Sequence, residues 1–70
     1  MDFNFCAHIL GRMMRRSIAE FEIIDAVKMP DITIKKNNRY YARKDLQRGT
    51  IEVVYEKTER YISLITVYWV

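Results

Sequence analysis

The segment VKMPDITIKK, residues 27–36, contains the point at which the spacing of apolar residues changes from helical to extended. Before Pro30, apolar residues recur three and four positions apart, which is the spacing of one face of a helix. After Pro30, Ile32 and Ile34 alternate with polar residues, which is the pattern of a strand. Proline also disfavours helical geometry in the residue before it. The sequence therefore predicts a helical first half and a stranded second half.

Two helices are predicted N-terminal to this boundary. In the first, which begins near Cys6, the apolar residues fall on one side of a helical wheel and the basic residues on the other. The apolar side, on which we expect Cys6 to act as a small buried residue, comprises Cys6, Ile9, Leu10, Met13 and Met14. The second helix has Ser17 as its predicted N-cap, and Glu20 completes a capping-box pattern. The apolar stripe of the second helix comprises Phe21, Ile23, Ile24, Ala26 and Val27.

Strands separated by short turns are predicted C-terminal to Pro30. They cover residues 31–36, 39–46, 51–57 and 61–70. The last of these is β-branched and aromatic throughout, which is typical of a central strand with both faces covered. Residues 2–5 are either a short strand or an extended lead-in. The sequence thus predicts one α+β domain over residues 1–70, in which two N-terminal helices pack on an antiparallel sheet of about four strands.

The few cysteine and histidine residues and the short apolar runs exclude several kinds of site. A single cysteine excludes an intramolecular disulfide and favours a reducing, cytoplasmic setting. One histidine and one cysteine do not form a metal site without distant carboxylates, so we expect neither a metal nor a cofactor. No apolar run approaches the roughly 20 residues of a membrane span, and the N-terminus lacks a signal-peptide pattern. We therefore expect no membrane partner.

Basic residues are concentrated in two segments of a chain whose formal charge is +3. Residues 35–48 carry six lysines and arginines, and residues 1–19 carry three arginines, each segment with one aspartate. Residues 20–34, which lie between them, are net acidic. If the two basic segments meet in space, they form a cationic face suited to a polyanion such as RNA. The alternative is a solvated surface that only keeps the protein soluble.

The segment HILGRMMRR, residues 8–16, is the first candidate site. His8, Arg12 and Arg16 are four positions apart and therefore neighbours on one helix face, with Arg15 on the same side. Histidine acts as a base or acid near neutral pH, and arginine binds phosphate through two hydrogen bonds. Adjacent arginines favour neutral imidazole, which suits a base. The alternative is that the histidine braces the helix against the sheet and that the arginines pair with carboxylates.

These residue types fit RNA cleavage without a metal. In that reaction a base takes the proton of a 2′-hydroxyl group, the oxygen attacks the adjacent phosphate, and cations stabilise the developing charge. An acid must protonate the oxygen that leaves the phosphate. His8, Arg12 and Arg16 are the candidates for these roles. A second polar group would come from the sheet, where Tyr68, Tyr55 and Tyr41 are the alternatives and Tyr68 is our candidate catalytic residue.

The segment RYYARK, residues 39–44, is the second candidate site. Tyr40 or Tyr41 would stack on a base, and basic neighbours would contact phosphates. The candidate nucleic-acid-binding residues are Arg15, Arg39, Tyr41, Arg43 and Lys44. The alternative is an edge strand whose charges discourage aggregation.

The whole chain resembles the small proteins of the domain of unknown function 4258 family, which are similar to RelE/ParE and BrnT toxins. The family pattern has an aromatic residue, a histidine and two arginines at fixed spacing. The matching residues are Phe5, His8, Arg12, Met13, Arg16, Ser17 and Ile18. An acidic helix, Pro30-Asp31 and strands at 53–56 and 65–69 complete the match. Ser17 stands where the family usually has glycine, and Ala19 where it usually has a capping residue.

The resemblance implies a RelE-like fold and a toxin-like domain of a toxin–antitoxin system. RelE-type members cleave mRNA, ParE-type members act on gyrase, and some relatives have no known activity, so the resemblance does not fix the chemistry. The leading hypothesis is an RNA-binding domain that cleaves RNA without a metal. The alternative is a non-catalytic module that binds nucleic acid or an acidic antitoxin. A third possibility is that residues 61–70 leave an apolar surface for formation of a homodimer.

Overall fold

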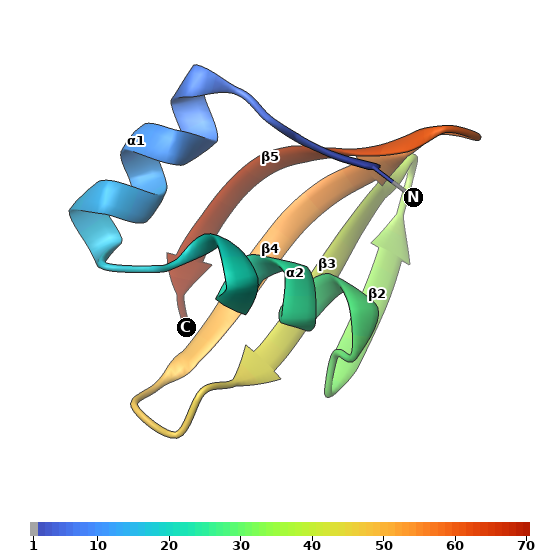
Figure 1. The fold of residues 1–70 in the computed structure, drawn as a ribbon. Coiled ribbons are helices and arrows are strands. Elements are labelled where there is room, and N and C mark those ends of the chain that lie inside the picture. The colour runs from blue at the N-terminus through green and yellow to red at the C-terminus, as the bar shows by residue number, and fades with distance from the viewer. Residues whose placement is uncertain (1) are drawn as a thin grey trace.

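A sheet with two helices on one of its faces makes up the structure, a computed structural model that describes residues 2–70 (Figure 1). The elements in chain order are β1 (Asp2–Phe5), α1 (Ala7–Arg16), α2 (Glu20–Lys28), β2 (Ile32–Lys36), β3 (Arg39–Asp45), β4 (Thr50–Lys57) and β5 (Tyr61–Trp69). The predicted change from helices to strands at Pro30 is confirmed, since α2 ends before it and β2 begins after it.

The sheet has five strands in the order β1-β5-β4-β3-β2, with β1 parallel to β5 and the other neighbours antiparallel. The prediction of about four antiparallel strands is confirmed for β2 to β5, but the sheet has one more strand, and that strand is parallel to its neighbour. The fifth strand is β1, whose four residues are too few for alternation to distinguish a strand from an extended lead-in. Only the tertiary structure brings the first and last strands of the chain side by side.

The most buried strand is β4, in which Ile51 to Tyr55 are all buried. It lies between β3 and β5, and its helix-facing residues Ile51, Val53 and Tyr55 belong to the hydrophobic core. The prediction that residues 61–70 form the strand with both faces covered is wrong, because burial alternates along β5. Composition does not show which strand lies at the middle of a sheet, since that depends on how the strands pair.

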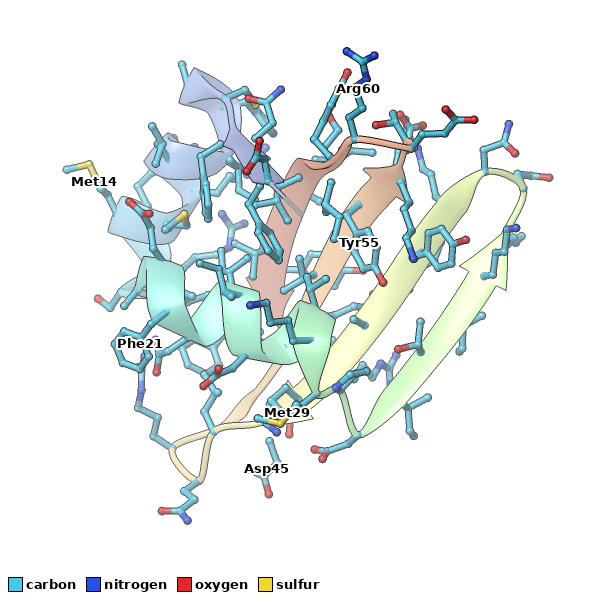
Figure 2. All side chains as sticks on the ribbon, turned by 45° about the vertical axis from the view of Figure 1, so that its right-hand side comes forward. Met14, Phe21, Met29, Asp45, Tyr55 and Arg60 are labelled. Carbon is cyan, nitrogen blue, oxygen red and sulfur yellow. The ribbon has the colours of Figure 1, made fainter. Side chains whose placement is uncertain are left out.

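Helix α1 buries only part of its apolar side. Ile9 and Met13 face the sheet and are 0% and 5% exposed, whereas Leu10 is 39% and Met14 82% exposed. Cys6, which precedes the helix, is exposed as well, so its predicted burial is wrong. The reason is that the sheet contacts one edge of the apolar side rather than its centre. Figure 2 shows Met14 directed away from the body of the protein.

Helix α2 also leaves part of its apolar stripe in solvent. Ile23 and Ala26 are fully buried, and Val27 packs against the core. Phe21, the second residue of the helix, is 68% exposed and lies outside the core (Figure 2). The periodicity therefore located the helix correctly but overestimated the width of its buried face.

The turn between the helices differs from the predicted capping box. Ser17 is the C-cap of α1, with a left-handed φ of 56°, and its amide donates to the carbonyl of Met14. The N-cap of α2 is Ala19, whose amide donates to the carboxylate of Glu22 at 2.9 Å. Alanine has no side-chain acceptor, so only this half of a capping box is formed. The predicted roles of Ser17 and Glu20 are therefore wrong, because the first helix ends in a left-handed turn before the second begins.

Replacing Ser17 by glycine is expected to raise the free energy of unfolding by about 1 kcal/mol. The left-handed conformation is costly for a residue with a Cβ and free for glycine, and the contacts of Ser17 are made by its backbone. Urea unfolding followed by circular dichroism measures the change. Serine to glycine at Ser63, inside β5, is the control and lowers stability by about 0.5–1 kcal/mol. A loss of stability in Ser17→Gly would contradict this account of the turn.

Arg48, in the turn between β3 and β4, connects that turn to both helices. Its Nη2 donates to the Ser17 carbonyl at 2.9 Å and to the Glu22 carboxylate at 2.7 Å. Its guanidinium lies over the Trp69 ring, 4.9 Å from the centroid. The Trp69 indole N–H in turn donates to the carbonyl of Arg16 at 3.0 Å. One arginine and one tryptophan thus connect the β3–β4 turn, the end of β5 and the junction of the helices.

Candidate functional site

The face of the sheet opposite the helices carries no helix, and we call it the open face. Ala42, Val53 and Val67 pack in the core on the helical side. Successive residues of a strand point to opposite faces, so their neighbours Tyr41, Arg43, Glu52 and Tyr68 project onto the open face. The register places Arg43 opposite Glu52, and Glu52 opposite Tyr68, across three adjacent strands. The open face therefore brings together polar residues from β3, β4 and β5.

Glu52 is the centre of this cluster. It is only 6% exposed although no helix covers it, because long side chains of the neighbouring strands surround it. Its Oε1 accepts a hydrogen bond from Nε of Arg43 at 2.8 Å, and its Oε2 accepts one from the hydroxyl of Tyr68. Both carboxylate oxygens are thus satisfied, which offsets the cost of burying the charge.

These contacts shift the pKa values of the three side chains in the cluster. Burial by itself raises the pKa of Glu52, but hydrogen bonds from Tyr68 and Arg43 outweigh it and lower the pKa below its ordinary value. The hydrogen bond to Glu52, together with burial, raises the pKa of Tyr68 to about 12. The same pairing raises the pKa of Arg43. At neutral pH the cluster therefore holds a carboxylate, a neutral phenol and a guanidinium.

Alkaline pH is expected to destabilise the protein through Tyr68. The phenol ionises near pH 10 in the unfolded chain but near pH 12 in the folded one, so the stabilisation is complete below pH 10 and is lost as the pH rises towards 12. After allowance for solvent screening, the loss attributable to Tyr68 is about 1 kcal/mol. Urea unfolding at several pH values measures it.

The matched variant is Tyr68→Phe, which keeps the ring and removes the ionisable group. We expect its stability to fall less between pH 9 and 11 than that of the parent protein. Tyr55, whose pKa burial also raises, contributes equally in both proteins. An identical alkaline loss in parent and variant would show that the Glu52–Tyr68 hydrogen bond does not form.

Arg43 remains available to a ligand in spite of its ion pair. Its side chain is 48% exposed, and only Nε contacts Glu52, which leaves the two terminal nitrogens for an anion. Tyr41 lies on the same face beside it. Arg39 is the first residue of β3, and its Nε lies 3.5 Å from Oε2 of Glu56. The open face thus presents a partly neutralised guanidinium next to a tyrosine.

The predicted residues of α1 lie in the other layer. Nε of Arg12 is 3.4 Å from Nε2 of His8, so the expected contact between residues four apart is present. Within residues 2–70, no hydrogen bond or ion pair joins the side chains of His8, Arg12 or Arg16 to Tyr68. Of the carboxylates of α2 that could pair with these arginines, Glu22 pairs with Arg48 instead. Arg15 is exposed on the same helix.

Apart from Arg48, which reaches Ser17 from the β3–β4 turn, the two basic segments lie apart. Helix α1 contacts β5, near one edge of the sheet. Strands β2 and β3 lie towards the other edge, and β4 separates them from β5 (Figure 1). Lys44 lies on the helical side and donates to the carbonyl of Met29 at 2.8 Å. Tyr55 (Figure 2) is also on that side, and its ring stacks on the ring of Tyr40 with the centroids 5.0 Å apart. Of the three alternative tyrosines, only Tyr41 and Tyr68 therefore reach the open face.

Comparison with known families gives one result. The family model described as "Domain of unknown function (DUF4258)" matches residues 5–69. The chain belongs to the DUF4258 family. The DUF4258 match begins before α1 and ends with β5, so it includes both candidate sites. Searches of the curated proteins and of the solved structures find no match.

Sequence reasoning missed Glu52 in this DUF4258 chain. The available signal was a carboxylate between Ile51 and Val53, in a strand that is otherwise largely apolar at its centre. No group of three or more potential metal ligands occurs among residues 2–70. In the same part of the chain, no helix is long and apolar enough to cross a membrane.

Proposed function

We propose that this chain is a toxin-like domain of the RelE/ParE/BrnT kind and that it binds single-stranded RNA on the open face. The observation that supports the proposal most is the position of Arg43. Its guanidinium is half exposed beside Tyr41, on a sheet face that no helix covers. An open sheet that carries aromatic and basic side chains is a recurrent surface for splayed-out bases and their phosphates.

The open face offers two complementary contacts. The terminal nitrogens of Arg43 bind a phosphate, while Glu52 fixes the other edge of the guanidinium. The ring of Tyr41 stacks on an adjacent base. Arg39 adds positive charge further along β3, although Glu56 reduces its effect. The expected ligand is therefore a short extended segment that follows the strands.

Cleavage without a metal is the second part of the proposal. His8 takes the proton of the 2′-hydroxyl group, and the 2′-oxygen attacks the phosphate. The bond from phosphorus to the 5′-oxygen breaks, and water protonates that leaving oxygen, while Arg12 and Arg16 stabilise the charge on the phosphate. The contact between His8 and Arg12 supports this assignment because it places a cation beside the imidazole, although Arg12 must release Nε2 of His8 before that nitrogen accepts a proton. RNA that reaches these residues must continue from the open face past β5, the strand on which α1 packs.

A second candidate function is binding without catalysis, of RNA or of an acidic antitoxin. The protonation states of the open-face cluster favour it. The pKa of Tyr68 is about 12, and its proton is bonded to Glu52, so the phenol is a poor base and its proton is already engaged. The carboxylate of Glu52 is likewise occupied by two donors and has a lowered pKa.

Binding and cleavage of a labelled single-stranded RNA in EDTA distinguish these functions. We expect the affinity to fall steeply with salt because phosphate contacts release counterions. Cleavage that is lost in His8→Ala and Arg12→Ala supports the catalytic assignment. Salt-dependent binding without cleavage supports the non-catalytic module. Absence of binding to any RNA tested would refute the RNA proposal.

A further inference from the structure

The junction of the two helices forms a shallow groove on the side of the protein away from the open face. Its volume is about 420 Å³. The residues that line it are mainly apolar and include Met13, Met14, Ile18 and Phe21, together with Glu22 and Arg48. The groove is formed by residues that the proposed RNA surface does not use.

Large apolar side chains border this groove and remain in solvent. Met14 is 82% exposed and Phe21 is 68% exposed, and Leu10, one turn before Met14, is 39% exposed. In Figure 2 the labelled Met14 and Phe21 both project outward from the helices. Large exposed apolar residues gathered around a groove are typical of a surface that is covered by another protein molecule.

Gly11 is unexplained by the fold of a single chain. A Cβ built at this position meets no atom within 4 Å, so nothing in the chain itself requires glycine there. Glycine inside a helix is less favourable than alanine. Gly11 lies on the outer side of α1, in the turn between Leu10 and Met14. A residue without a side chain at this position allows another backbone to approach closely.

The charges beside the groove identify what covers it. Helix α1 exposes Arg15 next to Met14, whereas α2 exposes Glu20 and Asp25 on either side of Phe21 in sequence. An anionic membrane surface is disfavoured by the carboxylates of α2. A second copy of the chain, related by a two-fold axis, places the basic α1 of each copy against the acidic α2 of the other.

We infer that the protein forms a two-fold homodimer through α1 and α2, with Met14 and Phe21 at the centre of the interface. Because the helices cover one face of the sheet, this dimer leaves both open faces directed outward and accessible. The inference is independent of the proposed RNA binding, which uses the opposite face, but it places the interface on α1, the helix that carries the proposed cleavage residues His8, Arg12 and Arg16. It also differs from self-association through residues 61–70, because no residue of β5 lines the groove.

Sedimentation equilibrium of the whole chain between about 1 μM and about 1 mM tests the inference. We expect a monomer–dimer equilibrium in the parent protein. Met14→Gln and Phe21→Ser, each at an exposed position, should weaken association about tenfold or more while leaving the circular dichroism spectrum unchanged. Ile34→Ser is the matched control, because Ile34 is 53% exposed on β2 and should not alter association.

Charge exchange tests the orientation of the two copies. Arg15→Glu alone, and Glu20→Lys with Asp25→Lys, should each weaken the dimer, and all three changes together should restore it. Gly11→Leu should abolish association because its side chain occupies the space of the second copy. A monomer at every concentration, a larger assembly, or association that only Ile34→Ser disrupts would overturn the inference. If the triple variant does not dimerise, the pairing of α1 of one copy with α2 of the other is wrong.

Discussion

Replacing Gly49 by alanine is expected to lower the free energy of unfolding by about 3 kcal/mol. Gly49 has a φ of 145°, which side-chain-bearing residues rarely adopt, and an added Cβ would lie 2.9 Å from Cζ3 of Trp69. The indole ring has little freedom to move, because its N–H is bonded to the Arg16 carbonyl and the Arg48 guanidinium lies over it. A chain of 70 residues is stable by only about 4–10 kcal/mol, so this single methyl group removes a large part of the total.

Gly11 provides the control within the same chain. The same substitution there meets no neighbouring atom and improves helix propensity, so Gly11→Ala should raise the free energy of unfolding by up to about 1 kcal/mol. Urea unfolding followed by circular dichroism measures both variants, at a concentration low enough to avoid association. Equal effects of the two substitutions would contradict the placement of the β3–β4 turn against Trp69.

Replacing Arg43 and Tyr41 together by alanine is expected to weaken RNA binding about 100-fold. Loss of Arg43 removes one phosphate contact. The slope of log affinity against log salt concentration should therefore fall by about one, which corresponds to one released counterion. Loss of Tyr41 removes a stacking contact of about 1–3 kcal/mol. Each single substitution should therefore lower the RNA affinity about tenfold. The two changes in binding free energy should be nearly additive only if both residues contact the same RNA segment independently. Fluorescence anisotropy with a labelled single strand measures these affinities.

Two further variants separate charge from geometry. Arg43→Lys keeps the charge but lacks the planar fork, so it should recover part of the affinity and the full salt dependence. Lys28→Ala removes an exposed charge from α2, in the helical layer, and should change the affinity little. If Lys28→Ala weakens binding as strongly as Arg43→Ala, the RNA surface lies on the helices and the open face is not the site.

The positions of the main elements could be predicted because their signals are local. Pro30 ends a helical spacing, and Asn37, with a φ of 58°, supports the tight turn between β2 and β3. The second turn was placed by the glycine at position 49, which has a positive φ. The left-handed Ser17 was misread as an N-cap because serine is favoured at that position and its other role depends on where α1 ends.

The candidate site was predictable only in part. Tyr41, Arg43 and Tyr68 were singled out from composition and spacing, but nothing local shows that they share a face across three strands. Glu52 was missed because its importance depends on its partners, which are 9 and 16 residues away in sequence. The expected juxtaposition of His8 and Arg12 was confirmed, since residues four apart on a helix are neighbours whatever the helix packs on.

The sequence by itself determined where the helices, the long strands and the turns lie, because periodicity and turn residues act over a few neighbouring positions. The tertiary structure alone decided that β1 pairs with β5, that β4 is the most buried strand, and that α1 turns only Ile9 and Met13 into the core. It also decided that Glu52 is buried between Arg43 and Tyr68. These outcomes depend on which surfaces meet when the chain closes, and contacts between distant residues are not encoded in the spacing of near ones.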